Sequence, residues 1–343
     1  MRYLIQFCLL GLLIFGVTAF LPPATTATLS EDTSVSELLR ELGDSPPGHA
    51  VRADLPGVSV EAGRQLVTEG IAPQPGGGHS SRQSVHFVCT SCHNIVKEDP
   101  DLRYADPEAR LAYAESQDIP FLPGTTLYGV VNRTSWYNDD YVKKYGDLVE
   151  GAQDDLRGAI ALCATECSQG RELEDWEMES ILAYLWTIDL KVGDLILTSA
   201  EKETIERAVS GNGHATAAID LIKSRYLSYS PAHFLVPPPD RQAGYPETGR
   251  PAQGQLLYER SCLHCHGEQR YSFFNLDETH YSYDFLTKHF PRYTRYSAYQ
   301  VIRYGTSPMN GKRAYMPHYT QERMSNQQVE DLRAFLAQGA GEN

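Results

Sequence analysis

Apolar residues recur at intervals of three and four along much of the chain, the spacing that places side chains on one face of a helix. The clearest case is residues 173–190, where Trp176, Ile181, Leu185 and Ile188 lie on one stripe. Almost no stretch shows the strict alternation of a strand, so the pattern predicts a mainly α-helical protein. Further helices are predicted over residues 60–67 (capped by Ser59), 107–116, 154–162, 200–209 (capped by Ser199), 215–226, 253–259, 298–304 and 325–337.

Proline and glycine clusters divide this helical pattern into parts. Residues 59–195 and 251–343 repeat one plan, in which an opening helix, a cysteine motif, a variable middle and a closing helix follow one another. Between them, residues 196–250 are predicted to be a helical connector that ends in a proline-rich linker. Residues 28–58 are polar and are predicted to form an extended arm, with one short amphipathic piece at 35–42. Two domains are also the natural expectation for 343 residues.

The N-terminus has a different pattern. Met1 and Arg2 precede an apolar run over residues 3–20, and small residues follow near 25–27. This order is typical of a secretory signal peptide, so residues 1–27 are predicted to be removed on export. The alternative is an uncleaved membrane anchor, although an apolar core of about 17 residues is at the short limit for crossing a bilayer. Membrane contact is expected only if this segment is retained.

Two stretches of the chain, residues 89–93 and 262–266, both read C-x-x-C-H. This is the attachment pattern of a c-type haem, because two thiols three positions apart reach the two vinyl groups of one porphyrin and the following histidine binds the iron. The alternatives are a zinc ribbon with two C-x-x-C knuckles and a thioredoxin-type dithiol, but neither explains a histidine after both pairs. The predicted thioether residues are Cys89, Cys92, Cys262 and Cys265, and the predicted iron ligands are His93 and His266.

The charge of the chain is uneven. The net charge is −14, and residues 28–248 contain 18 Lys and Arg against 35 Asp and Glu, whereas residues 249–343 contain 11 against 9. No basic stripe is present for nucleic acid, so a nucleic-acid partner is not expected. An acidic front part suits steering towards a basic partner such as another redox protein, and a general solubility charge is the equally simple alternative.

The repeated plan resembles the class I cytochrome c superfamily over about residues 90–190 and 254–337. Besides the two haem motifs, the resemblance is carried by Tyr315-Met316-Pro317 and by the closing-helix sequence of residues 331–336, matched by residues 182–185 in the first unit. It implies a mainly α fold of two tandem class I cytochrome c-like helical domains, each with one covalent haem c (iron). It also implies haem attachment outside the cytoplasm, and therefore a periplasmic or otherwise exported bacterial protein, possibly membrane-anchored.

The sixth iron ligand of the second unit should be a methionine in the loop before the closing helix. Met316 is favoured, since Pro317 follows it as in the superfamily, and Met309 is the alternative. Met324 directly precedes the helix-capping Ser325 and is expected to pack in the core instead.

The first unit has no methionine in the corresponding loop. Aligning the closing helices, 332–336 on 181–185, places Met316 opposite Thr165, between Cys163 and Cys167. Either one thiolate binds the first iron, with Cys167 slightly favoured, or the two cysteines form a local disulfide. We expect a carbonyl of residues 120–123 to hold the His93 ring, as in the superfamily. Arg133 is placed like the arginine that pairs with a haem propionate, or is a surface residue on a turn.

These residues predict an exported dihaem cytochrome c that transfers single electrons between other redox proteins, and they favour an electron carrier over an enzyme. One alternative is a dihaem sulfur-compound oxidoreductase of the thiosulfate dehydrogenase type, which also pairs a His/Cys haem with a His/Met haem. Another is the haem subunit of a membrane respiratory complex, which a retained N-terminal anchor would favour. A dihaem peroxidase fits less well, because it needs an open sixth position on one iron.

Overall fold

The computed structural model describes residues 29–306 and 315–341, and this part of the chain is mainly helical, as the hydrophobic pattern predicts. The described residues contain three isolated β-bridges and no strand. No helix among them is long and apolar enough to cross a bilayer, and the predicted signal segment lies outside the described residues. The α-helices are α1 (Val35–Glu41), α2 (Val60–Glu69), α3 (Pro107–Ser116), α4 (Asp139–Tyr145), α5 (Asp147–Glu150), α6 (Leu156–Leu162), α7 (Asp175–Leu185), α8 (Ser199–Val209), α9 (Ala215–Lys223), α10 (Pro251–Leu257), α11 (Leu263–His266), α12 (His280–His289), α13 (Ala298–Tyr304) and α14 (Asn326–Gly341).

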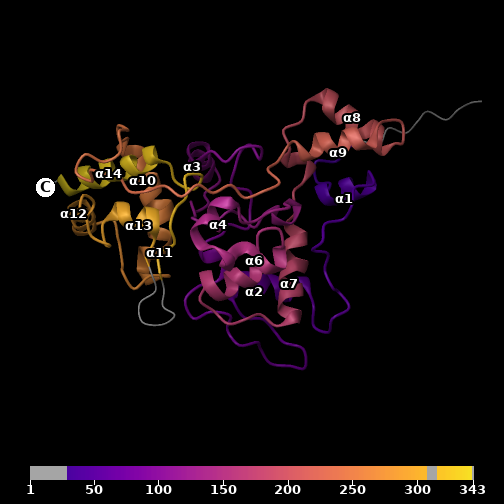
Figure 1. Ribbon diagram of the computed structural model, residues 1–343, viewed down its shortest axis with the longest axis horizontal. Helices are drawn as coiled ribbons and strands as arrows, with labels where there is room; N and C mark the ends of the chain where they lie inside the picture. Colours follow the sequence, from indigo (N-terminus) through magenta and orange to yellow (C-terminus); the bar gives the residue numbers. More distant parts are fainter. Residues whose placement is uncertain (1–28, 307–314, 342–343) are drawn as a thin grey trace, which may run out of the picture.

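Three hydrophobic clusters organise these helices, and they follow one another along the long axis of Figure 1. The central cluster lies between α2, α6 and α7. The second contains α10, α12, α13 and α14, and the third joins α1 to α8 and α9. Helix α1 of the predicted arm therefore packs against the helices of the predicted connector. The limits of the domains themselves remain a prediction.

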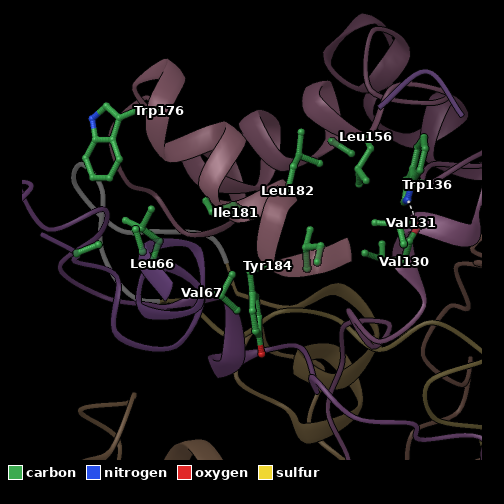
Figure 2. Packing of buried hydrophobic residues seen from close by; sticks show 14 of the residues in the cluster. Leu66, Val67, Val130, Val131, Trp136, Leu156, Trp176, Ile181, Leu182 and Tyr184 are labelled. Carbon is green, nitrogen blue, oxygen red and sulfur yellow. Dashed lines mark hydrogen bonds between the residues drawn. The ribbon is translucent and has the colours of Figure 1, made fainter. Parts of the chain in front are cut away.

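The central cluster depends on a close crossing of α2 and α7. Leu66 and Val67 of α2 face Ile181 and Leu182 of α7 across the core in Figure 2. The helices approach closely because α2 carries Gly63, where an added Cβ would lie 1.8 Å from the Ser180 carbonyl oxygen. Only glycine permits such an approach.

The second cluster repeats this crossing with α10 and α14. Here Gly254 of α10 lies against α14, and an added Cβ would lie 2.0 Å from the Asp331 carbonyl oxygen. Ser180 and Asp331 are thus equivalent positions in the two closing helices. They are 151 residues apart, the same offset that aligns residues 332–336 with 181–185 and Met316 with Thr165.

Helix α3 comes early in the sequence but packs in the second cluster. Leu111 and Ala114 of α3, with Phe121 after it, are buried among the residues of α10, α13 and α14. The segment that follows the first C-x-x-C-H motif therefore shares a core with the second motif.

Candidate functional site

The first C-x-x-C-H begins in a short 3₁₀ turn, Cys89–Ser91. The His93 Nδ1–H donates to the carbonyl oxygen of Thr125 (2.6 Å), which leaves Nε2 available for an iron. The expected acceptor in residues 120–123 is therefore wrong by two positions. The chain turns so that Gly124 N–H donates to the Cys92 carbonyl (2.9 Å), and this places the Thr125 carbonyl against the imidazole.

Gly124 is required by this geometry. An added Cβ would lie 2.6 Å from both Cε1 and Nδ1 of His93 and 2.7 Å from the Cys92 carbonyl oxygen. The loop therefore follows the ring closely, and burial lowers the pKa of His93, which keeps the imidazole neutral as a metal ligand must be.

The second C-x-x-C-H has the same arrangement in a different local structure. A π-helical segment, Tyr258–Cys262, continues α10 into α11, on which Cys265 and His266 lie. His266 Nδ1–H donates to the Phe274 carbonyl (2.7 Å), so its Nε2 is also left for an iron. Both predicted proximal histidines are thus oriented by a backbone carbonyl.

The two motifs lie side by side. Phe121 N–H donates to the Arg260 carbonyl (2.9 Å), while Gly124 N–H donates to the Cys92 carbonyl (2.9 Å). Because three residues of chain reach at most about 10 Å, the two acceptors lie within roughly 16 Å of each other. Residues 121–124 therefore bridge the first motif to the turn that precedes Cys262.

The six described cysteines are free thiols. No three His, Cys, Asp or Glu side chains within residues 29–306 and 315–341 converge as they would around a metal ion held by the protein alone. Paired thiols followed by a histidine with a free Nε2 fit a covalent haem.

Met316 lies at the edge of the second cluster, half-buried. Its backbone is held on both sides, since Met316 N–H donates to Thr306 Oγ1 (2.7 Å) and the Thr306 N–H donates to the Met316 carbonyl (2.9 Å). Met324 is buried in the core, as expected for a residue that only packs. Met309, the alternative ligand, lies outside the described residues.

Cys163 and Cys167 lie at the two ends of a π-helical segment that follows α6. Such segments are rare and are frequent at functional sites. Cys163 and Tyr137 are neighbours of the Cys167 sulfur. The hydrogen bond from Cys163 is the main cause of a lowered pKa of Cys167, whereas the same contact and burial raise that of Cys163. Cys167 is thus the better thiolate of the two.

Arg133 is half-buried, and its charge acts on His93 of the first motif. Its Nη1 donates to Ser230 Oγ (3.0 Å), and no ion pair to a carboxylate is formed with it in the described residues. Burial lowers the pKa of Arg133 to about 10. A desolvated arginine that lacks a carboxylate fits a haem propionate, as the resemblance implies.

A buried cluster of three charged residues was not found from the sequence. Glu98 lies between Arg323 (2.7 Å) and Arg110 (3.5 Å), and each is exposed by 7 % or less. Glu98 also accepts from Thr126 N–H (2.8 Å) and the Asn94 amide (3.0 Å). The sequence carries no signal for this cluster, because Arg323 lies 225 residues from Glu98.

The tyrosines of the second unit divide between the surface and the core. Tyr281, Tyr293 and Tyr296 are exposed, at 58 % or more. Tyr299 and Tyr319 are buried in the second cluster.

We expect the protein to lose stability in acid through Glu98. Burial alone would raise the pKa of this carboxyl, but Arg323 and Arg110 outweigh it and lower the value to about 2, against 4.5 in the unfolded chain. The stabilisation, on the order of 3 kcal/mol, is present above pH 4.5 and is lost as the pH falls towards 2. Glu98→Gln should therefore flatten the pH dependence of the unfolding free energy over this range.

The matched control is Asp118→Asn, which removes a carboxylate that is 95 % exposed and pairs with Arg260 (3.1 Å). Its acid profile should follow that of the wild type. An acid profile of Glu98→Gln as steep as that of the wild type would show that Glu98 does not carry this stabilisation.

One comparison with known proteins finds a match. Residues 249–336, which include the second motif and Met316, match the family model described as "Cytochrome C oxidase, cbb3-type, subunit III". No curated protein and no solved structure matches the chain. The match supports a c-type cytochrome, an electron-transfer protein with covalently bound haem c.

Proposed function

We propose that the chain is an exported dihaem cytochrome c that transfers single electrons between redox proteins. The main support for this proposal is the repeated helix crossing, in which Gly63 contacts Ser180 and Gly254 contacts Asp331. It gives the first unit the same framework as the part of the chain that matches a cytochrome c family. When bound, each haem supplies a reversible one-electron carrier. The protein attaches it, orients its histidine and excludes water.

The residues fit two such groups. His93 and His266 each present Nε2 and are held through Nδ1 by a carbonyl. Met316 is the proposed sixth ligand of the second haem, and Arg133 is the proposed propionate partner of the first. Intact mass and a pyridine haemochrome assay test the count, since the proposal requires two covalent haems in one chain. A chain with a single haem would refute it.

We further propose Cys167 as the sixth ligand of the first haem. It lies at the end of the π-helical segment Cys163–Cys167, and the neighbouring Cys163 and Tyr137 lower its pKa, which favours the thiolate. A thiolate favours ferric iron, so the first haem should have the lower reduction potential and electrons should rest on the second.

Replacing this ligand gives a prediction. Cys167→Met should raise the potential of the first haem, because a thioether favours ferrous iron, and spectroelectrochemical titration measures it. Cys163→Ser is the control and should shift the potential much less, because a hydroxyl still donates to Cys167. Equal shifts in both variants, or a Cys163–Cys167 disulfide in the purified protein, would remove Cys167 as the ligand.

The family description also bears on the alternative of a haem subunit in a membrane respiratory complex. Cell fractionation distinguishes a free electron carrier from a subunit of a membrane complex. A free electron carrier should be recovered without detergent, whereas a subunit should stay with the membrane and with partner chains. The sulfur-compound oxidoreductase alternative predicts steady turnover of thiosulfate by the purified protein, which a carrier lacks.

A further inference from the structure

Arg323 belongs to the second half of the chain but binds the loop that orients the first proximal histidine. It precedes α14, and its Nη2 donates to the Gly124 carbonyl (2.8 Å) and, more weakly, to the Leu122 carbonyl (3.3 Å). The carbonyl that accepts from His93 is that of Thr125, directly after Gly124.

Glu98 fixes the other side of this loop. Its Oε1 accepts from Arg323 (2.7 Å) and from the Thr126 N–H (2.8 Å). The Thr125 carbonyl therefore lies between a residue held directly by Arg323 and one held through Glu98. A five-residue loop secured at both ends leaves the ring little freedom to rotate.

Arg110 completes the arrangement from α3. Its Nη1 donates to the Leu122 carbonyl (3.2 Å), and its Nη2 donates to the backbone carbonyl of Arg323 (2.7 Å). Glu98, Arg110 and Arg323 are buried and Gly124 is half-buried, so water cannot readily replace the hydrogen bonds within the cluster when one partner is removed. The position of Arg323 is thus determined by the same cluster that it stabilises.

We propose that Arg323 is a positioning residue for the first haem: it holds the loop whose Thr125 carbonyl orients His93, and its charge raises the reduction potential of that haem. This rests on the proposed function only in requiring a haem on the first motif. The charged cluster carries two arginines against Glu98, and loss of one positive charge favours the ferric state of a nearby iron.

The test compares purified holoproteins with both haems shown by intact mass. Arg323→Gln should lower the ferrous-to-ferric ratio of the first haem at least tenfold at a fixed applied potential, a shift of about 59 mV for one electron. It should also change the ferric EPR spectrum of that haem, which reports the orientation of the histidine ring. The second haem should change less in both measurements.

Two further variants separate charge from position. Arg323→Lys keeps the charge but carries it on a shorter, flexible stem that does not reach the position of Nη2, the nitrogen from which Arg323 makes all three contacts. It should therefore restore most of the potential without restoring the EPR spectrum. Arg250→Gln is the control, because Arg250 also forms an ion pair with α3, through Glu108 (2.7 Å). Arg250 makes no contact with residues 122–126. It should leave both properties of the first haem as in the wild type.

A folding defect in Arg323→Gln is a real risk, because it leaves Glu98 buried with only one arginine. The double variant Glu98→Gln/Arg323→Gln avoids this and keeps the net charge of the cluster. We expect it to retain a potential near that of the wild type with an altered EPR spectrum of the first haem.

An EPR spectrum like that of the wild type in both Arg323→Gln and the double variant would overturn the positioning role. An unchanged potential in Arg323→Gln would overturn the effect of its charge. Neither result would affect the proposed dihaem function, which is decided beforehand by the number of haems on the wild-type chain.

Discussion

Changing Cys262 and Cys265 together to alanine should leave the chain with one covalent haem. The thiols of this pair are free and lie on one short helical region, so both thioether bonds of the second haem are lost together. Because Phe121 and α3 pack in the same cluster as α10, we also expect the remaining haem to sit in a less stable protein. Intact mass and the haemochrome spectrum measure the first effect, and thermal unfolding measures the second.

The reciprocal variant, Cys89→Ala with Cys92→Ala, should also retain one haem, now on the second motif. The control is Cys163→Ala with Cys167→Ala, which should keep two covalent haems, because these cysteines are proposed to form no thioether bond. Two haems on either motif variant would refute the assignment of the C-x-x-C-H sequences.

Met316→Ala should abolish the weak near-infrared band of an iron–thioether bond and lower the potential of the second haem. A thioether is a soft ligand that favours ferrous iron, so its loss should decrease the ferrous-to-ferric ratio by at least tenfold, or about 59 mV. The backbone hydrogen bonds with Thr306 do not involve the removed side chain, so the loop should keep its course. Near-infrared MCD and redox titration are the measurements.

Met324→Leu is the matched control. Met324 is buried in the second cluster, and leucine has a similar volume, so the band and the potential should both persist. If the band instead survives in Met316→Ala and disappears in Met309→Ala, the argument from Pro317 is wrong and Met309 is the ligand.

Local signals predicted much of the helical framework. Helices α3 and α13 begin and end where the pattern places them, and each begins after a side-chain cap, Asp106 and Ser297. The cap of α8 is Thr198 and not Ser199, a shift of one residue between two similar hydroxyls. Helices α4 and α12 were missed, because α4 buries none of its residues and α12 buries only Ser282, so neither shows a hydrophobic stripe.

The sites were predictable as far as they are local. The C-x-x-C-H motifs point to both proposed histidine ligands, but the carbonyls that orient these rings, on Thr125 and Phe274, depend on the course of each loop and have no sequence signature. The pairing of Glu98 with Arg323 spans 225 residues. Contacts at such separation are decided by the assembled fold, which periodicity and short motifs do not describe.

The long separation of Glu98 and Arg323 imposes an order on the making of this protein. A chain grows at about 5 to 20 residues per second, so the first motif exists for roughly 10 to 45 seconds before Arg323 has been synthesised. During this interval the loop around Thr125 lacks one of its anchors, and α3 lacks the helices that cover it. The loop that orients His93 therefore takes its final form only once Arg323 and α14 have been made, so the two halves of the chain complete their folding together.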